Sequence, residues 1–377
     1  MRVAIVAESF LPQVNGVTNS VVKVAEYLQS MGHEGIIIAP SDELVPPSFA
    51  GFPVVQIPAI ALPMYHEVRV GLTPTFVLDR ILKEFLPDVV HVASPFMIGS
   101  TALISAAHLS IPTVAIYQTD VPSFAKRYGL GLMEPVAWTR VRQIHELATL
   151  TLAPSSWARD QLVEHEIPRV KIWGRGVDTI QFNPRNRDEN LHKCWAPDSE
   201  ILIGYMGRLA PEKQVHDLTA LTSILGTRLV IIGTGPQKQT LEALLPQAQF
   251  TDKLTGTDLA RALATLDIFV HPGELETFCQ AIQEALASGV PVVAPAKGGP
   301  IDLVNSGEWG FLYPPGDVAT MRTQIEELVK NPSLRRRFSL AARGFTEQRS
   351  WSTICAQLVE FYEEAVSMTA GTIVDMR

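Results

Sequence analysis

The sequence predicts an α/β protein built from two successive, doubly wound parallel sheets. Three observations support this fold class. The chain has 377 residues, of which 46% are hydrophobic, so it can bury two cores. Short runs rich in Val and Ile alternate with longer amphipathic stretches, which is the pattern of parallel strands joined by crossover helices. This alternation stops after Trp173 and begins again at Ile201.

The first half of the chain contains the first set of alternating elements. Predicted strands occupy residues 2–7, 35–39, 88–93, 113–117 and 150–153. Predicted helices occupy residues 17–30, 73–85, 98–109, 133–149 and 156–166. Gly32 suits the end of the first helix, because glycine adopts the left-handed conformation common there without steric cost.

The second half repeats the pattern after a polar stretch at residues 185–200, which we interpret as the linker. Predicted strands occupy residues 201–206, 228–232, 248–251, 267–271 and 291–294. A helix-like segment follows each of them. We therefore expect a first domain at residues 1–185, a second at residues 186–350, and a last helix within residues 351–377.

Charge and cysteine content exclude several kinds of function. The formal net charge of -8 argues against nucleic-acid binding, which usually needs a basic face. The three cysteines are scattered, so we expect neither a disulfide framework nor a cysteine metal site, and a cytoplasmic location fits. The apolar run at the start is short and reaches Pro12, so we interpret it as neither a signal peptide nor a membrane span.

Any membrane contact is therefore expected to be peripheral, and predicted helix 73–85 is the first candidate. Its apolar residues are Phe76, Val77, Ile81, Leu82 and Phe85, and its cations are Arg80 and Lys83. Such a helix can rest on an anionic bilayer while its long cations extend toward the head groups. The alternative is that its apolar side faces the protein core. The basic pairs Lys126 with Arg127 and Arg140 with Arg142 could also contact an anionic lipid surface. The alternative is that they lie on a solvated helix face.

The residues just after each strand are the first place to look for chemistry, because open parallel sheets bind ligands beyond the carboxyl ends of their strands. Arg208 and Lys213 follow predicted strand 201–206. Two cations there could hold a diphosphate, the arginine through paired hydrogen bonds and the lysine as a point charge. The alternative is a solvated loop that happens to carry two basic residues.

A pair of glutamates follows predicted strand 267–271. Glu276 precedes a predicted helix at residues 278–288, and Glu284 lies in that helix. One carboxylate could bind sugar hydroxyls and the other a ribose, while the amides of residues 278–280 donate to a phosphate at the helix start. The alternative is that Glu284 is a surface residue and Glu276 only complements the helix dipole.

Several glycines also follow strands. Gly16 directly precedes the first predicted helix, where unpaired amides could meet a ligand. Gly233 and Gly235 could accommodate part of a nucleotide or form a tight turn, and the glycines of segment 296–302 could border the same pocket. The chain contains neither a Gly-x-Gly-x-x-Gly fingerprint nor an Asp-x-Asp pair, which argues against a dinucleotide site and against a carboxylate-held metal ion.

These motifs together resemble the family 4 retaining glycosyltransferases of the GT-B fold, over essentially the whole chain. The resemblance is carried by Pro12–Gly16, Arg175–Asp178 with Phe182, Gly207–Lys213 and the Glu276 and Glu284 pair. Segments 117–120, 153–156 and 271–284 are similar to the GDP-mannose-dependent α-mannosyltransferases of phosphatidylinositol mannoside and mannosyl-glucuronosyl diacylglycerol synthesis.

The resemblance implies two Rossmann-like domains facing across a cleft, with the last helix crossing back to the first domain. It implies that Arg208 and Lys213 bind the diphosphate, that Glu276 orients the transferred hexose, and that Glu284 holds the ribose. Guanine is expected near Thr251 and Lys253. The other expected donor-side residues are Gly16, Phe278, Cys279 and Gln280, and the expected acceptor-side residues are Asn15, Tyr117, Gln118 and Asp120. Many family members have a histidine at the position of Gln118, so Asp120 becomes the neighbour of interest.

The implied function is transfer of mannose from GDP-mannose to a glycolipid, with retention of configuration, without a metal or other cofactor, at the inner face of the plasma membrane. Either the leaving phosphate or Asp120 would take the proton of the acceptor. Two other classes stay open: a nucleotide-sugar epimerase or phosphorylase of the same fold, and a non-catalytic module that binds a nucleotide sugar.

Overall fold

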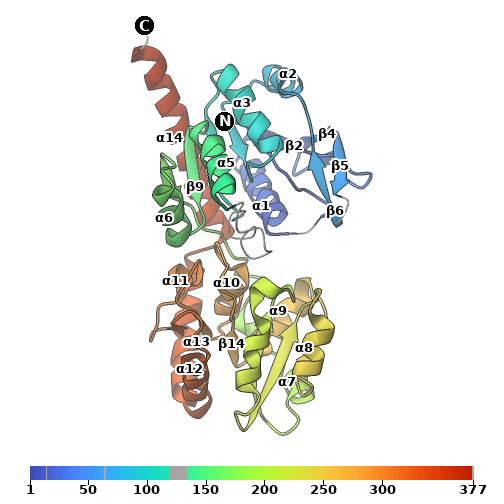
Figure 1. The fold of residues 1–377 in the computed structure, drawn as a ribbon, viewed down its shortest axis with the longest axis vertical. Coiled ribbons are helices and arrows are strands. Elements are labelled where there is room, and N and C mark those ends of the chain that lie inside the picture. Colours follow the sequence, from blue (N-terminus) through green and yellow to red (C-terminus); the bar gives the residue numbers. More distant parts are fainter. Residues whose placement is uncertain (14, 63–64, 119, 121–133, 376–377) are drawn as a thin grey trace. The chain divides into compact units, whose positions relative to one another are not determined.

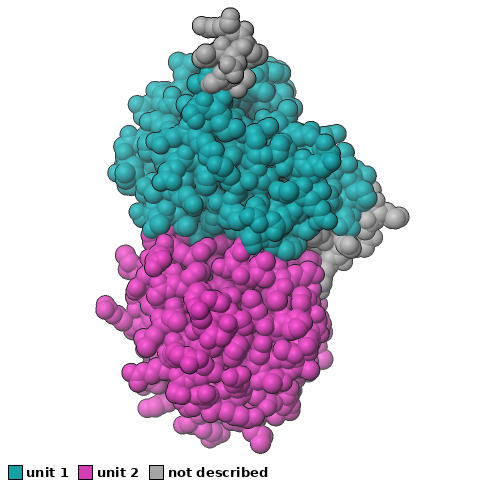
Figure 2. All heavy atoms as spheres, turned by 90° about the vertical axis from the view of Figure 1, so that its left-hand side faces the viewer, with its two compact units in different colours: residues 1–175, 352–377 teal, residues 176–351 magenta. Residues whose placement is uncertain are grey.

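The computed structural model describes residues 1–13, 15–62, 65–118, 120 and 134–375 (Figure 1). Lys126 and Arg127, proposed above for lipid contact, lie outside these residues. The chain divides into two compact units, one of residues 1–175 with 352–377 and one of residues 176–351 (Figure 2). Each unit contains its own parallel sheet with helices, as the sequence predicts.

The sheet of the first unit has eight strands in the order β10-β9-β8-β7-β1-β2-β4-β3. Its strand pairs are parallel, apart from the antiparallel pair of β3 and β4. The strands are β1 (Arg2–Val6), β2 (Glu34–Pro40), β3 (Ser48–Phe49), β4 (Phe52–Ile57), β7 (Val89–Val92), β8 (Thr113–Ile116), β9 (Leu150–Ala153) and β10 (Val170–Ile172). A separate hairpin joins β5 (Ala59–Leu62) and β6 (Tyr65–Gly71).

The described helices of this unit are α1 (Gly16–Ser30), α2 (Thr75–Phe85), α3 (Ile98–His108), α5 (Glu134–Glu146), α6 (Ser156–Glu164) and α14 (Trp351–Asp375), of which α14 belongs to the unit from Ser352 onward. Most of the apolar side of α2 faces the core. Leu78 and Leu82 are buried, and Val77, Ile81 and Phe85 pack against the same cluster. Phe76 is the exception, because 70% of it is exposed. The prediction that the apolar side of this helix faces the protein core is therefore correct.

Helix α14 is held to the first unit by polar contacts as well as by apolar packing. The hydroxyl of Tyr362 and Nδ1 of His91 on β7 are 2.6 Å apart in the core. Burial lowers the pKa of His91 to about 3, so its imidazole is neutral at physiological pH. Trp173 donates its indole N–H to the carbonyl of Ile354 over 2.8 Å. These contacts explain why the C-terminal helix belongs to the N-terminal sheet.

The units divide after Arg175, which is earlier than the boundary expected at residue 185. Arg175 donates hydrogen bonds to the Gly16 carbonyl (3.1 Å) and the Gln118 side chain (2.6 Å) of the first unit. Beyond it, Arg343 of the second unit donates to the carbonyls of Thr179 and Phe182. Since these contacts are set by residues far away in sequence, local composition did not reveal the boundary.

The sheet of the second unit has six strands in the order β13-β12-β11-β14-β15-β16, with parallel pairing. Successive residues of the strands enter different cores: Leu202 belongs to one cluster and Ile203 to the other. This is the burial of a sheet covered on both faces. The strands are β11 (Ile201–Met206), β12 (Thr227–Ile232), β13 (Gln249–Phe250), β14 (Ile268–Val270), β15 (Val292–Pro295) and β16 (Gly310–Tyr313).

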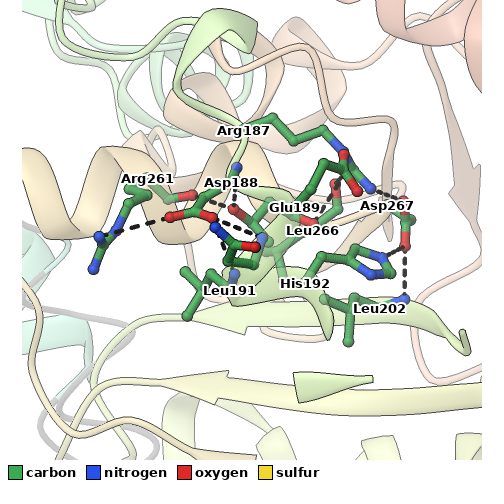
Figure 3. A network of polar contacts seen from close by, with 11 residues as sticks. Arg187, Asp188, Glu189, Leu191, His192, Leu202, Arg261, Leu266 and Asp267 are labelled. Carbon is green, nitrogen blue, oxygen red and sulfur yellow. Dashed lines mark hydrogen bonds and ion pairs between the residues drawn. The ribbon is translucent and has the colours of Figure 1, made fainter. Parts of the chain in front are cut away.

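The polar stretch taken for a linker is ordered and contains α7 (Glu189–Trp195). Asp188 caps this helix by accepting from the amides of Asn190 (2.8 Å) and Leu191 (3.0 Å). Arg187 and His192 both contact Asp267, which also accepts from the Leu202 amide at the start of β11 (Figure 3). The stretch is therefore part of the second unit, because the carboxylate of Asp267, directly before β14, binds it to the sheet.

The other helices of the second unit connect or flank its strands. They are the 3-10 helices η3 (Pro184–Asn186), η4 (Pro211–Lys213) and η5 (Val215–Leu221), and the α-helices α8 (Lys238–Leu244), α9 (Gly256–Thr265), α10 (Gln280–Ala287), α11 (Pro300–Leu303), α12 (Val318–Lys330) and α13 (Pro332–Glu347).

Candidate functional site

The candidate donor site lies where the strand order of the second sheet reverses. From β11 the chain proceeds to β12 and β13 on one side, whereas β14, β15 and β16 continue on the other side. Strands β11 and β14 are neighbours, so the loops that leave their carboxyl ends meet. Such a switch point is the usual ligand crevice of an open parallel sheet.

Lys213, Glu276 and His271 meet at this switch point. The Lys213 ammonium lies 2.5 Å from Oε1 of Glu276, and Nε2 of His271 lies 2.9 Å from the same oxygen. Burial alone would raise the pKa of Glu276, but Lys213 and His271 outweigh it and lower the pKa to about 2. Burial would lower the pKa of Lys213, and Glu276 instead raises it. The pair is therefore ionised throughout the physiological range.

Close backbone packing holds the Glu276 loop in place. The amide of Gly299 donates to the Glu276 carbonyl over 2.7 Å. A Cβ at Gly298 would lie 2.5 Å from that carbonyl oxygen, and one at Gly299 would lie 2.1 Å from the carbonyl oxygen of Phe278. Glycine is thus needed at positions 298 and 299, after β15, because a side chain at either position would keep the two loops apart.

Helix α10 begins at Gln280 rather than at residue 278, where the sequence placed its start. Its N-cap is Cys279, in the left-handed conformation at φ 74°. Burial and the carboxylates of Glu276 and Glu284 raise the pKa of the Cys279 thiol well above its usual value. Of the three amides expected to meet a phosphate, only that of Gln280 belongs to the first turn of the helix.

Glu284 lies in the second turn of α10, as the sequence predicts. Burial raises its pKa to about 8, and a hydrogen bond with Gln280 only partly opposes this. A carboxyl group in this condition is readily protonated and can donate as well as accept hydrogen bonds. A sugar hydroxyl is a suitable partner for such a group.

The raised pKa of Glu284 predicts a pH-dependent stability. As the pH rises from 4.5, the ordinary pKa of a glutamate, toward 8, the unfolded chain loses this proton while the folded chain keeps it, so folding is progressively disfavoured. We expect Glu284→Gln to raise the unfolding midpoint relative to the wild type, by roughly 5–15 °C more at pH 8 than at pH 5. Thermal melts across this range measure it, with Glu308→Gln, an exposed glutamate of the same unit, as control. A midpoint difference that does not change with pH would contradict the prediction.

Arg208 lies in the loop after β11, at the same switch point. Its side chain is exposed and forms no hydrogen bond or ion pair with the residues that the structure describes. Its guanidinium is therefore accessible to an anion. Tyr205, which precedes it on β11, stacks its ring on His271 at 5.8 Å between centroids.

The loops after β11, β12 and β13 are in contact with one another. A Cβ at Gly233 would lie 2.0 Å from the Gly207 carbonyl oxygen, and one at Gly235 would lie 2.4 Å from that of Leu209. These glycines permit close approach of two loops, which is the structural reason for a tight turn here. The Gly233 amide donates to the Asp252 carbonyl, which places the loop of Thr251 and Lys253 next to the loop of Gly233.

One group of described side chains has donor atoms suited to a metal ion. The ligand-type atoms of His271, Glu276 and Cys279 lie within 4.8 Å of one another. Two features favour the lysine ammonium as the local cation instead. Lys213 already contacts Glu276, and a thiol with a raised pKa is a poor ligand because metals bind the thiolate.

The candidate acceptor-side residues of the first unit form a connected set. Asn15 caps α1 by accepting from the amides of Val17 and Thr18, each over 3.0 Å. Tyr117 donates to the buried Asp120 over 3.1 Å, and burial together with this carboxylate raises the pKa of Tyr117 well above its usual value. Gln118 donates to the Ala93 carbonyl over 2.5 Å and accepts from Arg175, so its amide is fixed in orientation.

Tyr117 and Gln118 also border a pocket of about 460 Å³ within the first unit. Its wall is largely apolar and comes from the loop after β7 and from α5. The other lining residues are Glu8, Ser94, Pro95, Phe96, Val136, Ala137, Arg140, Val141, Ile144 and His145.

Two residues were quoted in the sequence motifs but given no role. His271 binds Glu276, and Arg175 links Gly16 with Gln118. His271 stands immediately after β14, so the rule that ligands gather after strands could have indicated it. For Arg175 no comparable rule exists, because its partners lie 57 and 159 residues away.

The fold and this site define a class: the chain is a glycosyltransferase of family 4, with two parallel-sheet units of the GT-B type. The model of Glycosyltransferase Family 4 matches residues 14–181, and that of Glycosyl transferases group 1 matches residues 186–345. The chain is 46% identical to a GDP-mannose-dependent alpha-mannosyltransferase of Mycobacterium tuberculosis, over 96% of each chain. A protein of the same description from Corynebacterium glutamicum is 42% identical over 98% of this chain and 90% of its own.

More distant similarities agree with this class. A sulfoquinovosyl transferase of Arabidopsis thaliana is 33% identical over 93% of this chain and 71% of its own. Among solved structures, the sucrose-phosphate synthase of Thermosynechococcus elongatus aligns with a TM-score of 0.79 at 16% identity, covering 97% of this chain and 99% of that one. Anabaena HepE in complex with UDP aligns with a TM-score of 0.78 at 18% identity, covering 97% and 100%. The two solved structures support the fold.

Proposed function

We propose that the protein is a GDP-mannose-dependent α-mannosyltransferase that acts on a glycolipid. The proposal rests above all on the ionised pair of Lys213 and Glu276 at the switch point of the second sheet. It is supported by relatives, matched over 90% or more of their length, that are described as GDP-mannose-dependent. In this proposal Arg208 and Lys213 bind the diphosphate, Glu276 orients the mannose, and Glu284 binds the ribose. Thr251 and Lys253 contact the guanine.

The proposed reaction breaks the bond between the anomeric carbon and the diphosphate. Negative charge grows on the departing diphosphate, and fixed cations stabilise it most effectively where water is scarce. In this proposal the two cations are the ammonium of Lys213, whose side chain is 20% exposed, and the accessible guanidinium of Arg208. Because these cations supply the positive charge, we propose that the reaction needs no metal ion and no other cofactor.

We further propose that the configuration at the anomeric carbon is retained. Retaining glycosidases use a carboxylate nucleophile, but Glu276 is held by Lys213 and His271, which makes it a poor nucleophile. We therefore favour a same-face route in which the leaving phosphate takes the acceptor proton. Asp120, which is bound to Tyr117, is the alternative base.

The proposed acceptor is glucuronosyl diacylglycerol or a phosphatidylinositol mannoside, reached at the inner face of the plasma membrane. None of the described helices is long and apolar enough to cross a membrane. Helix α2 exposes Phe76, Arg80 and Lys83 at positions that share one helical face. An aromatic side chain with two cations suits peripheral contact with an anionic bilayer.

The deciding experiment offers the protein a panel of labelled sugar nucleotides with each lipid acceptor, with and without a chelator. We expect a mannolipid from GDP-mannose, an α-anomer by proton NMR, and the same rate in the chelator. An inverted anomer would exclude retention, and loss of activity in the chelator would exclude metal independence. Sedimentation with anionic liposomes at low salt tests the membrane contact, which fails if the protein stays in the supernatant.

The same panel separates the two other functional classes. An epimerase or phosphorylase would release an altered sugar nucleotide or a sugar phosphate without needing a lipid. A non-catalytic module would bind GDP-mannose and leave it intact. Either result would replace the proposed function.

A further inference from the structure

The pocket of the first unit combines an apolar wall with a cation that is accessible among its described lining residues. Phe96 and Val136 at the pocket are 47% and 57% exposed, although both are large apolar side chains. Exposed apolar groups around a concave site are typical of a binding surface. The occupant is therefore expected to have an apolar part.

Arg140 on α5 supplies the cation. Its side chain is exposed and contacts the Ser100 hydroxyl at 3.3 Å, and it forms no ion pair with the described residues. Its neighbour Arg142, on the same helix, is instead engaged by Glu146 and Glu166. Arg140 is thus the arginine of this pair that can bind a ligand.

The other described titratable side chains that line the pocket are either uncharged or held by hydrogen bonds within the protein. Glu8 accepts hydrogen bonds from the amides of Phe96, Met97, Ile98 and Gly99, which it holds at the start of α3. Burial lowers the pKa of His145 to about 4, so its ring is uncharged at neutral pH. Among the lining residues that the structure describes, the charge available to a ligand is therefore positive.

We infer that this pocket binds the acceptor head group and that Arg140 pairs with an oxyanion on it, so that the enzyme selects anionic over neutral glycolipids. The inference rests on the proposed transfer to a glycolipid and adds a specificity-determining residue to it. A planar guanidinium binds a carboxylate or a phosphate through paired hydrogen bonds, and the apolar wall contacts the sugar face and the glycerol. The carboxylate of a glucuronosyl lipid and the phosphate of a phosphoinositide are both suitable oxyanions.

The test compares matched acceptors in neutral detergent micelles, which remove any attraction to a charged surface. Glucuronosyl diacylglycerol and a phosphatidylinositol monomannoside are each compared with glucosyl diacylglycerol, which is neutral. The enzymes are the wild type, Arg140→Gln, and the control Arg142→Gln, which removes the same charge from the same helix. The readout is kcat/KM for each acceptor at saturating GDP-mannose.

We expect the wild type to prefer at least one anionic acceptor, and Arg140→Gln to lower kcat/KM for it by roughly 10- to 100-fold, the loss typical of a charged hydrogen bond. The loss on the neutral lipid should be much smaller than the loss on the anionic one, and Arg142→Gln should behave as the wild type. Whichever anionic lipid shows the loss identifies the oxyanion. Equal use of anionic and neutral acceptors by the wild type, or an equal loss on both in Arg140→Gln, would overturn the inference.

A binding measurement keeps this test separate from that of the proposed function. If no sugar nucleotide is turned over with any lipid, the proposed function fails. Saturation-transfer NMR of the full chain still decides the role of Arg140, with methyl glucuronide compared with methyl glucoside and inositol 1-phosphate compared with inositol. Preferential binding of at least one of the two anions by the wild type but not by Arg140→Gln supports this role, and no preference for either anion in the wild type refutes it.

Discussion

Replacing Lys213 by alanine is expected to lower kcat/KM for GDP-mannose by about 1,000-fold, the upper range for loss of one charge-stabilising donor. The variant loses the ammonium beside the proposed diphosphate. It also leaves the Glu276 carboxylate, 14% exposed at its side chain, without its main counter-charge, and that carboxylate would then repel the donor. Steady-state kinetics and calorimetric binding of GDP measure both effects.

Lys213→Ala also breaks a largely buried ion pair, which commonly costs about 3–5 kcal/mol of stability. The double variant Lys213→Ala with Glu276→Gln removes the unpaired charge, so we expect it to regain a near wild-type melting temperature while staying inactive. Lys330→Ala, which removes an exposed lysine paired with Glu326 on α12, is the matched control and should keep its activity. Substantial activity in the folded double variant would exclude Lys213 from the donor site.

Arg208→Ala is expected to lower kcat by about 100-fold while the melting temperature stays within about 1 °C of the wild type. The physical reason is the exposure of its side chain, which has no partner among the described residues whose loss could affect folding. Kinetics and thermal melts on one preparation give both numbers.

The matched control for Arg208 is Arg185→Ala, which removes another exposed arginine of the second unit. It should behave as the wild type in both measurements. A wild-type rate in Arg208→Ala would exclude the guanidinium from the diphosphate site, and a large fall in its melting temperature would show that the side chain has a structural role instead.

The regular elements could be predicted where burial imposes a strong pattern. Strand β11 was predicted at its observed bounds, because a central parallel strand is apolar on both faces. Strand β10 was missed because it is three residues long at the edge of the sheet and has two exposed residues. Helix α7 was missed because its polar residues resemble a linker, and its order depends on Asp267, which is distant in sequence.

The candidate site could be predicted in part, for the same reason. The positions of Arg208, Lys213, Glu276 and Glu284 after strands or in the following helix were evident, since strand ends determine where loops begin. The contact between Lys213 and Glu276 was not, because it joins residues 63 positions apart. The pKa shifts of Glu276 and Glu284 in opposite directions follow from burial and neighbours that only folding brings together.

The sequence by itself determined the class of fold, the order of most strands and the residue types that follow them, because hydrophobic periodicity and turn residues act locally. Only the tertiary structure decided which function each glycine and cation serves: Gly233 and Gly298 allow loops to touch, Lys213 neutralises a glutamate, and Arg208 and Arg140 stay accessible. The physical reason is that close packing and charge pairing join side chains far apart along the chain, and their energies depend on burial that no local stretch of sequence specifies.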